Sequence, residues 1–110
     1  MMAYDEELAS RIREELAQFP GLEEKKMFGG VGFLIRGNMA VGVHGQDLIV
    51  RVGRERYEEA LSRPHARLFD ISGRPSVGWV LVAPDGYEVE RDLRQWINQG
   101  VEFAQSLPAK

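Results

Sequence analysis

Residues 25–35 read Lys-Lys-Met-Phe-Gly-Gly-Val-Gly-Phe-Leu-Ile, and this stretch decides how the chain folds. Its β-branched and aromatic side chains are typical of a strand. The same stretch carries three glycines, which cost backbone entropy and leave no side chain to pack. We therefore expect a strand whose glycines permit a bulge or the close approach of a helix.

Two turn signals follow this strand. Residues 36–39 read Arg-Gly-Asn-Met, and residues 44–47 read His-Gly-Gln-Asp. Gly and Asn tolerate the positive φ values of a two-residue hairpin loop, so both segments predict tight reversals of the chain. The strands expected over residues 27–36, 39–44 and 47–52 then form an antiparallel meander.

The register of this meander follows from the turn positions, and it divides the side chains between two faces. Position 34 is predicted to face position 41, and position 41 to face position 50. One face is apolar throughout, and we expect helices to cover it as the core. Its members are Phe28, Leu34, Met39, Val41, Val43, Leu48, Val50 and Val52.

The opposite face of the meander is also too apolar for an ordinary solvent-facing surface. In the predicted register Phe33 lies across from Gly42, where an aromatic ring can cover the bare glycine. One interpretation is that another segment, such as the C-terminal helix, covers this face. The other is a surface for self-association or for a protein partner, because contiguous exposed apolar area marks an interface. The candidate partner or dimer residues are Val31, Phe33, Ile35 and Ile49.

The remaining segments predict helices around this sheet. Tyr4, Leu8, Ile12 and Leu16 recur at intervals of four residues and indicate an amphipathic helix, which Pro20 ends. The other expected elements are a short helix over 54–62, a loop over 65–76 with an extended piece at 67–71 and a turn at 72–75, an interior strand over 77–83, and a long helix over about 87–107.

The composition is that of one globular domain spanning residues 1–110, since 44% of the residues are hydrophobic and 28% are charged. We expect an α/β (α+β) fold, an antiparallel meander with an N-terminal, a short middle and a long C-terminal helix. The formal charge of −3 argues against a nucleic-acid partner held by bulk electrostatics. The chain has no cysteine, which fits a reducing compartment, and no apolar run of about 18 residues. We expect a soluble cytoplasmic protein without a membrane partner.

The glycine cluster of residues 29–32 does not predict a nucleotide site. Phosphate loops place their glycines between a strand and a helix N-terminus, where free amides point at the anion. Here the glycines lie within apolar strand sequence, without a Gly-Lys-Ser/Thr ending. We expect no cofactor.

Other chemistry-bearing residues are scattered. His44 and His65 have no neighbouring ligand at metal-site spacing apart from Asp47, so we expect no metal. No serine lies in a Gly-x-Ser-x-Gly elbow. Carboxylates such as Asp70 and Asp85 leave an acid/base pair open, but nothing selects them, and we name no catalytic residue.

Arginines gather between residues 51 and 76, where six of them outnumber four acidic residues. The guanidinium fork suits carboxylates and phosphates. The candidate anion-binding residues are Arg51, Arg54, Arg67 and Arg74. The alternative is an ordinary surface whose arginines pair with neighbouring glutamates.

The order of the elements carries a family resemblance. Met27-Phe28-Gly29-Gly30 is followed by a strand and hairpin, then by Gly-Asn-Met-Ala at 37–40, Leu-Ile-Val-Arg-Val at 48–52, Gly-Trp-Val at 78–80 and a Trp-bearing last helix. In these motifs the chain resembles the N-terminal domain of the TfoX/Sxy competence-regulator family. The lead from 74–75 into 78–79 is similar to short stand-alone members, with Ser76 where a methionine is usual.

The resemblance implies an antiparallel sheet with helices, a bacterial cytoplasmic origin and, for full-length members, a part in regulating competence genes. It implies no catalytic residue. Full-length regulators carry a further helical domain, which the 110 residues do not contain. We therefore expect a short stand-alone member.

Three functions compete at this point. The first is a non-enzymatic regulatory or protein-interaction domain, acting as a homodimer through the surface around Phe33, so that Phe33→Asp leaves a folded monomer. The second is a small-ligand-binding protein or unrecognised enzyme, with a cleft between the glycine-bearing strand, Arg51 and the 65–76 loop. The third is nucleic-acid contact through the arginines of 51–76, which requires steep salt dependence.

Overall fold

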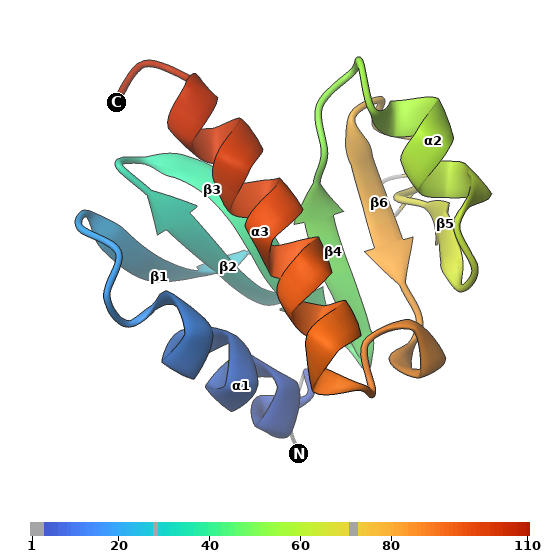
Figure 1. Cartoon of the computed structure of the whole chain (residues 1–110), viewed down its shortest axis with the longest axis horizontal. Helices are drawn as coiled ribbons and strands as arrows, with labels where there is room; N and C mark the ends of the chain where they lie inside the picture. The colour runs from blue at the N-terminus through green and yellow to red at the C-terminus, as the bar shows by residue number, and fades with distance from the viewer. Residues whose placement is uncertain (1–3, 28, 71–72) are drawn as a thin grey trace.

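Six antiparallel strands form one sheet in the order β1-β2-β3-β4-β6-β5 (Figure 1). The structure is a computed structural model, and it describes residues 4–27, 29–70 and 73–110. The strands are β1 (Leu22–Met27), β2 (Gly30–Ile35), β3 (Asn38–His44), β4 (Asp47–Arg51), β5 (Ala66–Leu68) and β6 (Trp79–Val82). The helices are α1 (Glu6–Leu16), α2 (Tyr57–Ser62), the short 3₁₀ turn η1 (Pro84–Gly86) and α3 (Glu90–Ser106).

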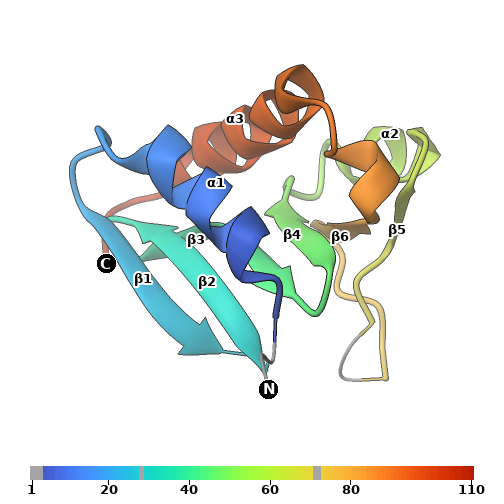
Figure 2. The same cartoon turned by 90° about the horizontal axis from the view of Figure 1, so that it is seen from below.

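All three α-helices lie on one side of the sheet, as Figure 2 shows. Leu8, Ile12 and Leu16 place the apolar stripe of α1 in the core, and α3 contributes its own buried stripe around Trp96 and Ile97. Asp5 caps α1 by accepting hydrogen bonds from the backbone amides of residues 7 and 8. The predicted fold class is confirmed, as are the three helices.

The glycine-bearing stretch is a hairpin and not one continuous strand. β1 ends at Met27 and β2 begins at Gly30, and Gly29 between them has φ +74°. Gly30 lies against β3, because a Cβ there would stand 1.8 Å from the carbonyl oxygen of Val43. The glycines therefore serve a turn and a close backbone approach, and Phe28 lies outside the described residues.

Both predicted reversals are present. Arg36 and Gly37 have φ values of +52° and +85°, the left-handed pair that a two-residue hairpin loop requires. The second reversal joins β3 to β4, where His44 pairs with Asp47.

The predicted register between β2 and β3 is wrong. Phe33 pairs with Val41 and Leu34 with Met39, so Ala40 has no partner of its own and forms a bulge. One extra residue reverses the face of every side chain beyond it. The predicted pairing of residues 41 and 50 is confirmed.

The bulge redistributes the apolar side chains between the two faces. Val41, Val43, Leu48, Val50 and Val52 lie in the helix-covered core as predicted. Leu34 and Met39 instead lie in a second cluster on the other face, together with Ile49, Phe69 and Leu81 and flanked by Met27 and Trp79. Gly42 pairs with Gly32 and Ile49, and the end of the Met39 side chain lies against it in place of Phe33.

The later elements match their expectations closely. β6 lies between β4 and β5, which confirms an interior strand. The extended piece expected at 67–71 is the short edge strand β5, and the turn expected at 72–75 falls partly outside the described residues. No helix in the described ranges has the length and apolar character needed to cross a bilayer.

Candidate functional site

The predicted partner surface is not exposed in this chain. Val31, Phe33 and Ile35 lie in the core under the helices, with exposed fractions of 1%, 0% and 1%. Ile49 is on the other face but is also only 1% exposed, within the second cluster. The error follows from the bulge at Ala40, which turns the β2 side chains inward. Any docking surface must use other residues.

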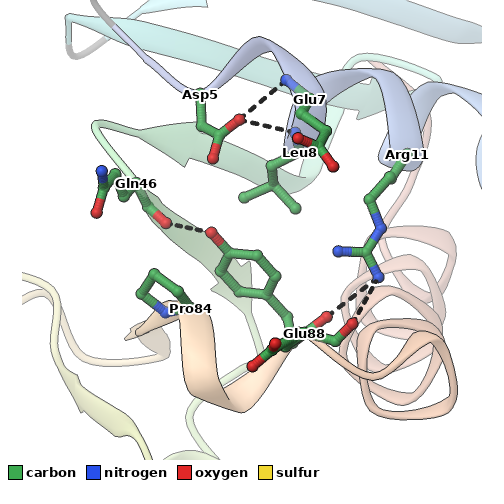
Figure 3. A pocket seen from close by; sticks show the side chains of 8 residues that line it. Asp5, Glu7, Leu8, Arg11, Gln46, Pro84 and Glu88 are labelled. Carbon is green, nitrogen blue, oxygen red and sulfur yellow. Dashed lines mark hydrogen bonds between the residues drawn. The ribbon is translucent and has the colours of Figure 1, made fainter.

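One hollow, of about 270 Å³, is lined by residues of α1, the β3–β4 turn and the connection from β6 to α3 (Figure 3). Its polar groups are mostly bonded to one another. The hydroxyl of Tyr87 donates to the carbonyl of Gln46 at 2.5 Å, and Arg11 donates to the carbonyls of Tyr87 and Glu88 at 3.2 and 3.3 Å. These contacts fasten three segments together, so we interpret the hollow as a structural joint.

Tyr87 is the perturbed titratable group of this joint. Burial, assisted by the negative charges of Asp5 and Asp47, raises the pKa of its phenol to about 12. The phenol therefore remains neutral and keeps donating its hydrogen bond at neutral pH.

A second hollow, the Phe103 pocket, has a volume of about 420 Å³. It lies between α3 and the loop from β4 to α2, which rises beside the C-terminal half of α3 in Figure 1. Its lining residues are Val52, Gly53, Arg54, Glu55, Arg56, Gln99, Glu102, Phe103 and Ser106. No β2 residue lines it, because β3 separates β2 from β4. The Phe103 pocket is therefore not the predicted cleft beside the glycine-bearing strand.

An arginine lies against the aromatic ring of this pocket. The guanidinium carbon of Arg51 lies over the Trp79 ring at 5.0 Å from its centroid and over the Phe103 ring at 5.2 Å. Phe69 stacks on Trp79 with a centroid distance of 5.8 Å. Burial lowers the pKa of Arg51, as expected for a cation held against aromatic carbon.

The structure separates the four arginines predicted as anion ligands. Arg54 lines the Phe103 pocket, and Arg51 lies against the Phe103 ring without lining the pocket itself. Arg67 lies on the sheet face opposite the helices and is paired with Asp47 at 2.5 Å, and Arg74 is exposed on the segment before β6. This arrangement does not make one continuous basic stripe of the kind that follows a phosphate backbone.

The residues whose side chains commonly bind metal ions are also dispersed. Throughout the described ranges no three His, Cys, Asp or Glu side chains are grouped so as to hold a metal ion. His65 lies between α2 and β5 with φ +70°, and His44 lies at the end of β3.

The outer strand β1 is a further surface feature. Its only strand neighbour among the described residues is β2, and its four central residues, 23–26, are exposed. Glu24 forms an ion pair with Arg13 of α1 at 2.8 Å, and this guanidinium lowers the pKa of the Glu24 carboxyl.

Comparison with known protein families identifies the family to which this fold belongs. The family model described as the TfoX N-terminal domain matches residues 14–104. The chain belongs to this family. The match extends from the last turn of α1 to the last turn of α3 and so includes all six strands of this TfoX N-terminal domain. No curated protein and no solved structure matches the chain.

Sequence reasoning missed several residues that shape these surfaces in the TfoX N-terminal domain. Trp79 and Phe103 were assigned only to a strand and a helix, although each contacts Arg51. The usable signal for β1 was the order Glu-Glu-Lys-Lys at residues 23–26, a strand that is polar on both faces. Such a pattern is typical of an edge strand.

Proposed function

We propose that this TfoX N-terminal domain is a non-enzymatic regulatory or protein-interaction domain that acts as a homodimer, joined through the free edges of two β1 strands. The competence-regulating role and the cytoplasmic location implied by the resemblance belong to the same proposal. Family membership supports it, and the charge order along β1 carries it.

A free sheet edge is a template for pairing, because half of its backbone donors and acceptors point outward. β1 provides six residues of such edge, with no other described strand beside it (Figure 2). A uniformly basic edge repels a second copy. Residues 23–26 instead carry two acidic side chains followed by two basic ones, so an antiparallel copy presents opposite charges.

Symmetry restricts how two copies pair. A two-fold axis perpendicular to the sheet keeps both sets of helices on the same side, so directly opposed residues must share a face. On the face opposite the helices, Glu23 then faces Lys25 of the second copy, and the contact occurs twice. This register is centred on Glu24, whose charge Arg13 already neutralises in each chain.

The alternative register is centred on Lys25 and is less favourable. It places the Lys25 side chains of both copies opposite each other, and Lys25 has no ion-pair partner among the described residues. Like charges directly opposite are destabilising. The Glu24-centred register therefore avoids a repulsion that the Lys25-centred one contains.

Charge reversal tests the dimer by sedimentation equilibrium at low salt. Lys25→Glu or Glu23→Lys turns two attractive cross-strand pairs into repulsive ones. At about 1 kcal/mol per pair, dimerisation weakens by about 2 kcal/mol, or about 30-fold. Mixing the two variants restores attraction at both positions, so we expect a heterodimer with nearly wild-type affinity.

Lys26→Glu is the matched control, because in the Glu24-centred register Lys26 faces Leu22 and not an acidic residue. It should change the dimer affinity by less than about threefold. A wild-type chain that stays monomeric up to millimolar concentration contradicts the proposal. A dimer that both single reversals leave intact, or variants that do not recover on mixing, would contradict it equally.

A further inference from the structure

Arg51 is held in place by aromatic rings and not by an acidic partner. The guanidinium carbon of Arg51 lies 5.0 Å from the centroid of the Trp79 ring and 5.2 Å from that of the Phe103 ring. Trp79 belongs to β6 and Phe103 to α3. Arg51 and Trp79 are also directly paired across β4 and β6, which fixes the distance between their backbones. Rings that occupy the flat faces of a guanidinium leave its in-plane N–H donors free at the edge.

Other arginines of this chain pair with acidic groups. Among the described residues the pairs are Arg13 with Glu24, Arg56 with Glu102, Arg67 with Asp47, Arg91 with Asp92, and Arg94 with Glu15 and Glu90. No carboxylate of the described residues lies within ion-pair distance of Arg51, although its side chain is only partly exposed. A cation that has lost part of its hydration without gaining a counter-charge favours binding of an anion.

The adjoining Phe103 pocket supplies room and a second unpaired donor. Phe103 belongs to both features, since its ring contacts Arg51 and lines the 420 Å³ hollow. The side-chain oxygen of Gln99 accepts from Arg63 at 2.9 Å, which sets the orientation of the amide. The Gln99 amide nitrogen is then buried with no acceptor within the described structure. A ligand or a water that offers an oxygen there satisfies it.

The charge and shape of the pocket define the class of ligand. Val52 and the Phe103 ring provide apolar wall. The rim carries both signs of charge, because Arg54 and Arg56 stand beside Glu55 and Glu102, and Arg56 pairs with Glu102 at 3.9 Å. The Arg51 guanidinium next to the Phe103 ring is therefore the cation that decides the charge of the ligand. The volume lies within the range of small-molecule sites. We infer that this pocket binds a small organic oxyanion, a carboxylate or phosphate monoester, with the charged group on the Arg51 fork and the apolar part against Phe103.

The probes for this site are benzoate and phenyl phosphate, with benzyl alcohol as their neutral counterpart. Titration is followed by the NMR signals of the Trp79 indole N–H and the Arg51 Nε–H. We expect saturable shifts at both groups, with the neutral probe at least tenfold weaker. The ratio of the two anion affinities shows whether the site prefers a carboxylate or a phosphate.

Arg51→Gln should weaken both anionic probes at least tenfold. Arg51→Lys, which keeps the charge and loses the fork, should weaken them by an intermediate factor. Arg67→Gln is the control, because Arg67 is already paired with Asp47, whereas Arg51 lies against the Phe103 ring that lines the pocket. Dispersed amide spectra of each variant verify the fold.

Three results overturn the inference: no saturable shift at Trp79 and Arg51, equal affinity for benzyl alcohol, or equal loss of affinity in Arg51→Gln and Arg67→Gln. The first rejects a site, the second reduces it to an apolar hollow, and the third assigns binding to the general positive charge. The dimer test does not involve any residue of this pocket, so the two proposals fail separately.

Discussion

Phe33 distinguishes the observed register from the one expected from the turns. Its side chain is fully buried beneath the helices, whereas the expected register placed it on the far face. Truncation of a buried Phe to Ala costs about 3–5 kcal/mol. A domain of this size has about 5–15 kcal/mol of total stability, so Phe33→Ala should remain folded with a melting temperature lower by about 15–25 °C. Phe33→Asp adds an unpaired buried carboxylate and should not fold.

Urea unfolding followed by circular dichroism measures this difference at a fixed protein concentration, because dimerisation makes apparent stability concentration-dependent. Leu68→Ala is the control, since Leu68 is 41% exposed and its truncation should cost less than about 1 kcal/mol. A Phe33→Ala variant within 1 kcal/mol of wild type, or a well-folded monomeric Phe33→Asp, would refute the observed register.

Two further predictions concern packing and pH. In α3, Gly100→Ala should destabilise the fold by at least about 1 kcal/mol in urea, despite the better helix propensity of alanine, because the new Cβ would lie 2.4 Å from the carbonyl oxygen of Ala40. The pKa of Tyr87, raised from 10 to about 12, favours the neutral phenol in the folded state. Stability present below pH 10 should therefore fall between pH 10 and 12, by no more than about 3 kcal/mol. Tyr87→Phe should abolish this decline and Tyr57→Phe should not.

The hairpins after Ile35 and after His44 and the helices were predictable because local chemistry determines them, whereas the hairpin between β1 and β2 was expected as one strand. Gly37 and the apolar spacing of α1 act within a few residues, and both predictions are confirmed. The bulge at Ala40 is different, since nothing in Asn-Met-Ala-Val distinguishes a bulged strand from a regular one. One unpaired residue was enough to reverse the face of Phe33 and move the predicted surface into the core.

The candidate site was predictable only in part, for a similar reason. A count of arginines identified Arg51, but contacts between distant segments decide what each arginine does. Arg67 forms a hydrogen-bonded ion pair with Asp47, 20 residues away in the sequence, and is therefore less available to a ligand. Arg51 contacts Phe103, which the sequence places only within a helix, and has no ion-pair partner among the described residues. Tertiary pairing therefore selects among residues that look equivalent in the sequence.

The position of the helices explains why the two proposed surfaces, the β1 edge and the Phe103 pocket, lie away from the two faces of the sheet. One sheet face is used for the core, and the far face is closed by its own cluster around Ile49, Leu81 and Phe69. Both surfaces that we propose therefore lie at the margins of the sheet. β1 is the outer strand on one side, and Arg51 ends β4, separated from β1 by β2 and β3. Because no residue is shared between the two proposed surfaces, a second copy paired at β1 would leave the Phe103 pocket open to a ligand in each chain.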